Sequence, residues 1–101
     1  MDMQKIRRED MRWHLLTAIN LSRPVGIYTV PLLSVMKTVY ADCTHQEVRV
    51  NLDYLEARGL VRIERDPTDR WTVELTRYGI DFVEYTIAAQ PGISRPQMTR
   101  V

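Results

Sequence analysis

Several features that mark common protein classes are missing from this sequence of 101 residues. It contains one cysteine, Cys43, so an internal disulfide is excluded and a reducing compartment is predicted. No apolar run approaches the roughly 18 residues that a membrane span requires, and the charged first ten residues do not resemble a signal peptide. We therefore expect a cytoplasmic protein that does not associate with membranes.

The signatures of catalysis and metal binding are also absent. The four glycines are scattered and form no phosphate-binding loop, and the carboxylates do not gather on one face of any predicted element. Cys43, His45 and the distant His14 provide no set of four metal ligands. The sequence predicts a protein that is not an enzyme and holds no metal or cofactor.

A surplus of positive charge is missing as well. The net charge is +1, whereas proteins that bind duplex DNA usually carry excess cations, because phosphate contacts dominate their affinity. The cations present are twelve arginines and two lysines. Arginine suits phosphates and guanine edges, although an arginine-rich genome accounts for the bias equally well.

The length predicts a single domain over residues 1–89, followed by a flexible tail over 90–101 that contains proline and glycine but no core stripe. Apolar periodicity predicts helices over 4–20, 29–40, 44–58 and 76–89. In the first of these, Ile6, Leu15, Leu16 and Ile19 form the expected buried stripe.

The start of the third helix carries the clearest local signal. Thr44 and Glu47 have the spacing of a capping box, in which each side chain accepts a hydrogen bond from the other residue's amide. Gly59 follows the last predicted turn and can adopt the left-handed conformation that ends many helices.

Alternation with period two then predicts a β-hairpin over 62–74, with a turn at 66–69 and an arginine on each side of its tip. The order of elements is helix, helix, turn, helix, hairpin, helix. This order predicts an α+β fold that is mostly α, the winged helix-turn-helix.

Three stretches resemble winged-helix regulators of the MarR type. They are Tyr-Leu-Glu-Ala-Arg-Gly-Leu-Val at 54–61, Asp-Pro-Thr-Asp-Arg at 66–70 and Leu-Thr-Arg-Tyr-Gly at 75–79. In that family the first stretch closes the recognition helix, the second is the tip of the wing and the third opens the last helix. The chain is shorter than typical members and its recognition helix is more acidic, and its compact form is similar to small prophage proteins. The resemblance implies a transcriptional regulator that binds double-stranded DNA, with helix 44–58 in the major groove and wing 62–74 on the backbone.

The expected DNA contacts follow from helical geometry and from the resemblance. Gln46 suits adenine, Arg49 suits guanine and Val50 suits a thymine methyl group. The complete candidate set is Thr44, His45, Gln46, Arg49, Val50, Asp53, Arg65 and Arg70. The alternatives are an i,i+4 ion pair between Arg49 and Asp53, and pairing of the two wing arginines with Asp66 and Asp69.

The last predicted helix has two apolar stripes, which predicts burial on two sides. We expect a homodimer, and the alternative is that the first and last helices pack together within a monomer. The candidate dimer contacts are Trp13, Phe82, Tyr85 and Ala89.

Two further hypotheses remain open. The resemblance allows a small-molecule effector, with Tyr28, Tyr40, Tyr54 and Trp71 as a candidate aromatic cage, although such spacings are more typical of a core. The neutral charge and acidic third helix favour the second function class, a winged helix that binds another protein, for example one encoded by a phage, and does not bind DNA.

Overall fold

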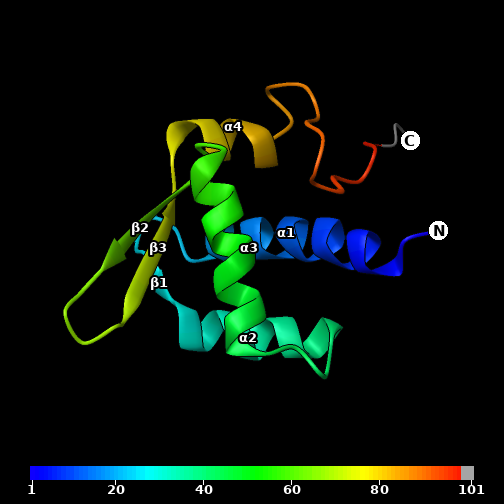
Figure 1. The fold of residues 1–101 in the computed structure, drawn as a ribbon. Helices are drawn as coiled ribbons and strands as arrows, with labels where there is room; N and C mark the ends of the chain where they lie inside the picture. Colours follow the sequence, from blue (N-terminus) through cyan, green and yellow to red (C-terminus); the bar gives the residue numbers. More distant parts are fainter. Residues whose placement is uncertain (99–101) are drawn as a thin grey trace.

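The computed structural model describes residues 1–98. Its elements are α1 (Met3–Leu21), β1 (Ile27–Tyr28), α2 (Thr29–Val39), α3 (His45–Ala57), β2 (Val61–Arg65), β3 (Trp71–Leu75) and α4 (Arg77–Val83). Helix α3 crosses α1, α2 packs beneath both, and the β2–β3 hairpin extends away from the helices as the wing (Figure 1). The predicted winged helix-turn-helix architecture is confirmed.

The sheet contains one strand more than the hairpin predicted from the sequence. Its order is β1-β3-β2 and both pairings are antiparallel, with Ile27 opposite Val73 and Ile63 opposite Val73 on the other side. Residues Val61, Ile63, Trp71, Val73 and Leu75 point their side chains into the core, as alternation requires. The sheet thereby anchors the base of the wing.

The core lies where α1, α2, α3 and the sheet meet. Its most deeply buried side chains are Met11, Leu15, Leu16, Ile19, Leu32, Met36, Val48, Leu52, Leu55, Leu60, Val73 and Phe82. The stripe expected for the first helix is wrong at Ile6, which is 44% exposed, whereas Met11 is fully buried. The N-terminal end of α1 projects past α3 (Figure 1).

The Leu-Thr-x-x-Gly stretch has a packing role. Thr76 caps α4 by accepting from the amide of Gly79, and its hydroxyl donates to the carbonyl of Gly59. A Cβ at Gly79 would lie 2.0 Å from the carbonyl oxygen of Leu60. Only glycine allows α4 to lie this close to the strand that begins the wing.

Helix α4 ends at Val83, and the expectation of a helix to Ala89 is wrong. Tyr85 has φ of 63°, a left-handed conformation that turns the chain away from the helix axis. Within the second apolar stripe, Phe82 lies in α4, Tyr85 packs against Trp13 of α1 from the turn, and Ala89 is exposed. Periodicity alone did not distinguish this turn from a longer helix.

The expectation of a flexible tail does not describe residues 90–98. Ile93 is buried in the core, the amide of Ser94 donates to the carbonyl of Glu9, and Arg95 donates to the carbonyls of Phe82 and Ile87. This segment contacts α1 and α4 through Ile93, Ser94 and Arg95, whereas Met98 is 64% exposed. The remainder of the predicted tail, 99–101, lies outside the described residues.

Candidate nucleic-acid interface

Helix α3 presents one uncovered ridge. Val48, Asn51, Leu52 and Leu55 face the core, whereas the opposite side of the helix is open. The exposed residues of this ridge are Gln46, Val50, Asp53 and Ala57. The ridge lies beside the wing, which is the arrangement that a helix-turn-helix needs to enter a groove.

The start of α3 is held by its cap and by α2. The Thr44 hydroxyl accepts from the amide of Glu47 at 3.1 Å, which confirms one half of the predicted capping box. His45 Nε2 lies 2.8 Å from the hydroxyl of Thr29, the first residue of α2. Thr44 remains exposed and His45 is half-buried, so both stay at the surface where α3 begins.

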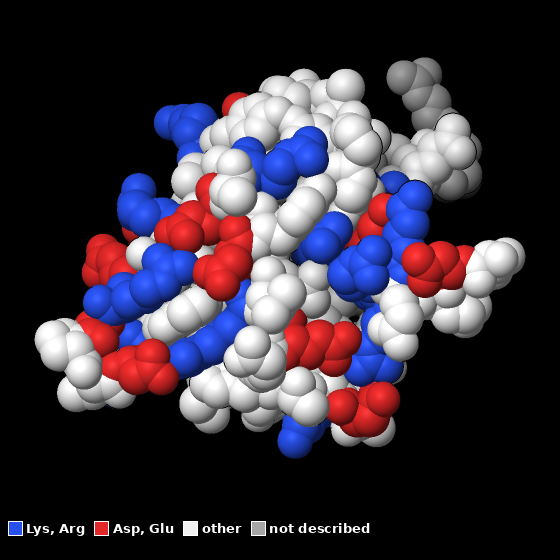
Figure 2. All heavy atoms as spheres, in the orientation of Figure 1, with Lys and Arg blue, Asp and Glu red and all other residues white. Residues whose placement is uncertain are grey.

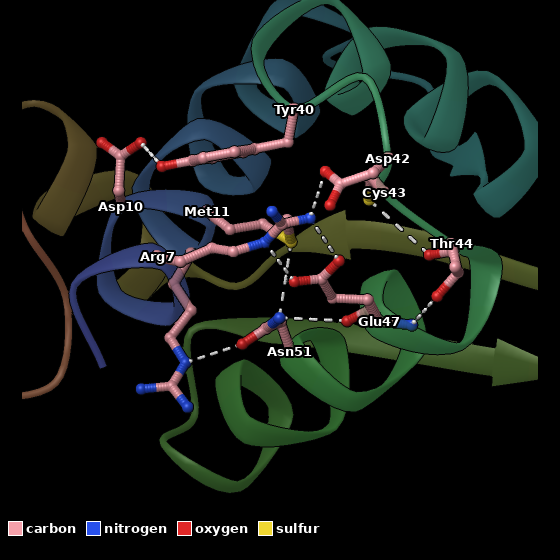
Figure 3. Close-up of polar contacts among 10 residues, drawn as sticks. Arg7, Asp10, Met11, Tyr40, Asp42, Cys43, Thr44, Glu47 and Asn51 are labelled. Carbon is pink, nitrogen blue, oxygen red and sulfur yellow. Dashed lines mark hydrogen bonds and ion pairs between the residues drawn. The ribbon is translucent and has the colours of Figure 1, made fainter. Parts of the chain in front are cut away.

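The other half of the capping box is absent, because Glu47 binds a distant arginine. Arg7 donates to both carboxylate oxygens of Glu47, at 2.8 and 2.9 Å, and lies 3.0 Å from Asp42 (Figure 3). The hydrogen bond from Arg7 to Asp42 holds the pKa of Asp42 below its ordinary value. The bidentate pair ties the start of α3 to α1.

Tyr40 completes this junction. The guanidinium of Arg7 lies 4.5 Å from the centre of the Tyr40 ring, and the Tyr40 hydroxyl donates to Asp10 at 2.6 Å (Figure 3). The hydrogen bond to Asp10, together with burial, raises the pKa of Tyr40 to about 12. Sequence reasoning missed Arg7 and Asp10 and gave Tyr40 a different role, because these residues are separated from their partners by 30 residues or more.

A second junction, the buried arginine cluster, consists of Arg12, Asn51, Tyr54 and the carbonyl of Gly92. Arg12 is 8% exposed, donates to Asn51 and to Gly92, and lies 3.5 Å from the centre of the Tyr54 ring. Burial lowers the pKa of Arg12, and neither of its two hydrogen bonds goes to a carboxylate. The cluster joins α1, α3 and the C-terminal segment.

The wing contacts α3 through a third arrangement, the wing cluster, which comprises Trp71, Arg49, Arg65, Asp53, Glu56 and Asp69. The guanidinium groups of Arg49 and Arg65 each lie 4.4 Å from the centre of the Trp71 ring. Cations in this position are attracted by the aromatic ring. Trp71 thus connects one arginine of α3 with one arginine of the wing.

The ion pairs of the wing cluster cross between the two elements. Arg49 of α3 binds Asp69 of the wing tip at 3.0 Å, and Arg65 of the wing binds Asp53 at 2.8 Å and Glu56 at 3.0 Å. The hydrogen bonds from Arg65 lower the pKa of Glu56. The alternative of a local Arg49–Asp53 pair is therefore wrong in its partners, because each residue binds the opposite element.

Arg70 lies at the tip of the wing. Its guanidinium is 4.7 Å from the centre of the Tyr28 ring, and its Nε is 3.7 Å from Asp66. Asp66 mainly organises the turn, because it accepts from the hydroxyl and amide of Thr68, and this lowers its pKa. With its side chain 57% exposed, Arg70 remains accessible.

The surface around α3 and the wing is mixed in charge. Residues 44–75 carry five arginines and seven carboxylates, a net charge of −2. Figure 2 shows blue and red side chains alternating on this face, without a continuous positive track. Nonspecific attraction of phosphates to this face is consequently weak.

Three of the four residues predicted at a dimer interface contact one another within the chain. Trp13 packs edge-on against Phe82 and Tyr85, with ring centres 6.1 Å apart in both cases. Phe82 is fully buried and so has no surface to offer a second copy, whereas Ala89 is exposed. The structure places the first and last helices together, which is the monomer alternative for Trp13 and Phe82.

The structure does not bring together the residues of the remaining predicted sites within residues 1–98. Tyr28, Tyr40, Tyr54 and Trp71 lie against different arginines and do not form one cage. Within residues 1–98, no three histidine, cysteine or acidic side chains are grouped as metal ligands, and no helix is long and apolar enough to cross a membrane. An apolar groove of about 340 Å³ lies between α1 and α2, lined in part by Ala18, Leu21 and Val35.

Comparison with known proteins identifies similar folds. RosR from H. salinarum is 22% identical with a TM-score of 0.63, over 75% of this chain and 71% of RosR. MarR is 26% identical with a TM-score of 0.55, over 82% of this chain. The chain spans only 58% of the MarR structure. No protein-family model and no curated protein sequence matches the chain.

The fold is thus that of the MarR-type winged helix-turn-helix, as the resemblance in the sequence implied.

Proposed function

We propose that this chain is a DNA-binding transcription regulator, with α3 in the major groove and the wing on the backbone. The observation that carries the proposal is the uncovered ridge of α3 beside an exposed wing, on a frame similar to MarR and RosR.

The wing supplies the phosphate contacts in this proposal. Arg65 and Arg70 are paired with exposed carboxylates, and such surface pairs contribute only about 0–1 kcal/mol. A phosphate can therefore replace the single carboxylate partner of Arg70 at small cost, whereas at Arg65 it must replace both Asp53 and Glu56. At the start of α3, Thr44 and His45 complete the backbone contacts, because helix N-termini favour anions.

Asp53 is compatible with this arrangement because Arg65 neutralises it. When Arg65 turns to a phosphate, Asp53 can accept from a cytosine amino group in the groove. We also propose that two copies bind together, because paired recognition helices contact half-sites about one helical turn apart. Tyr85 and the exposed Ala89 remain the candidate contacts between them.

The test is binding of labelled duplex DNA by fluorescence anisotropy across a series of salt concentrations. Affinity is expected to fall on a log–log plot with a slope of about −0.9 for each phosphate contacted. Arg65→Met and Arg70→Met should each reduce that slope by roughly one, whereas the control Arg77→Met, on α4, should leave it unchanged.

A second function, binding of another protein, is favoured by the charge of −2 over residues 44–75 and by the crossed ion pairs. Absence of any DNA binding at low salt would reject the regulator and leave this candidate.

A further inference from the structure

We propose that α3 reads A·T base pairs through Gln46 and Val50, and that Arg49 positions the wing and does not read guanine. This inference rests on the proposed DNA binding and concerns the base preference of the same surface. It follows from which side chains of α3 are bound to other groups of the protein and which are available to contact a base.

Arg49 is held from several sides. Nη1 donates to the Asp69 carboxylate at 3.0 Å, Nη2 donates to the Asp69 carbonyl at 2.5 Å, and the group stacks on Trp71. Its side chain is 18% exposed, and its Nε is buried. A bidentate bond to guanine would require the guanidinium to leave both Asp69 and Trp71, and the tip of the wing would lose this link to α3.

Gln46 and Val50 are the free residues in the N-terminal half of α3. Gln46 is exposed and takes part in no side-chain hydrogen bond among residues 1–98, and Val50 is 49% exposed. A glutamine amide matches the paired acceptor and donor of adenine in the major groove, and an apolar side chain matches the thymine methyl group.

The spacing of the two residues sets the spacing of the bases. Residues four apart lie on the same face of a helix and are separated by a rise of about 6 Å. Because this rise covers roughly two steps of B-form DNA, we expect the two A·T pairs to lie about two base pairs apart. Their separation distinguishes this readout from a general preference for bendable A·T-rich sequence.

The experiment is selection of binding sites by the full chain from duplexes with a randomised segment, followed by sequencing. Wild-type protein should enrich A·T at two positions about two base pairs apart. Gln46→Ala should reduce the preference at the adenine position roughly tenfold. Arg49→Met should lower overall affinity without changing the preferred bases, and Arg77→Met serves as the control.

Replacement of thymine by uracil in the selected site removes only the methyl group. It should weaken binding by wild-type protein several-fold and leave Val50→Ala unaffected. This comparison tests the Val50 contact without relying on a change of the protein alone.

Different outcomes separate the two proposals. A guanine preference that disappears in Arg49→Met, or equal binding of all sequences, would overturn the A·T readout while DNA binding stands. Failure to retain any duplex at low salt would overturn both.

Discussion

Two of the clusters that set an arginine against an aromatic ring, the buried arginine cluster and the wing cluster, do so under opposite conditions. In the buried arginine cluster, Arg12 lies on Tyr54 and its hydrogen bonds go to an amide and a carbonyl. In the wing cluster, Arg49 and Arg65 lie on Trp71 near the surface, and carboxylates compensate their charge. The inner group joins segments that must stay together. In the outer group Arg49 holds the wing to α3, whereas the more exposed Arg65 is the arginine that can exchange its partners with a ligand.

The largest difference between the clusters should appear in Arg12→Met. This change keeps most of the side-chain volume and leaves Asn51 and the carbonyl of Gly92 without their donor, at a cost of about 1–3 kcal/mol in the free energy of unfolding. Urea denaturation measures this loss, and hydrogen exchange at the Ser94 amide should accelerate. Arg8→Met, at an exposed position of the same helix, is the control. Equal effects of the two changes would mean that the buried contacts do not stabilise the fold.

Arg49→Met is expected to have a smaller effect on stability, under about 1 kcal/mol, because surface ion pairs contribute little. Its effect should be local instead, with faster hydrogen exchange over the wing tip at 66–70. In about 1 M salt, where screening acts within roughly 3 Å, the stability difference from wild type should shrink, whereas that of Arg12→Met should persist. A loss of stability over the whole Arg49→Met protein would contradict the proposed difference between the wing cluster and the buried arginine cluster.

The smallest effect concerns pH. Because Arg65 lowers the pKa of Glu56 below its ordinary value of 4.5, this pair stabilises the folded chain above about pH 4.5. The stabilisation is lost as pH falls through the lowered pKa of the folded state. Glu56→Gln should therefore flatten the acid side of the stability profile by a few tenths of a kcal/mol. Glu64→Gln, at an exposed neighbouring position, provides the comparison, and identical profiles would argue against the Arg65 bond.

Local signals in the sequence predicted much of the architecture. Thr44 and Gly59 predicted the bounds of α3 to within about a residue, because capping depends on neighbouring atoms. The same reasoning failed for residues 84–89, which lie beyond the end of α4 although their apolar spacing fits a helix. Local patterns carry no information about which distant segment receives a side chain.

The candidate site was predicted in part for the same reason. Its exposed residues, such as Gln46 and Val50, follow from helical periodicity. The partners of Arg49 and Arg7 lie 20 and 40 residues away in the sequence. Only the tertiary structure therefore shows that these two cations are bound to groups within the protein. The net charge of the sequence indicated a weak electrostatic attraction to phosphates, but it could not show which arginine side chains are paired with groups of the protein.

Cys43 lies in the turn between α2 and α3 and can serve as a chemical probe of the helix-turn-helix. Cys43 is 3% exposed, and burial raises the pKa of its thiol, so reagents that modify thiolates are largely excluded while α2 and α3 stay joined. As the sequence holds no other thiol, its modification rate measures opening of this turn directly. The same property leaves a cysteine introduced on the exposed α3 ridge free to accept a fluorophore while the native one stays protected.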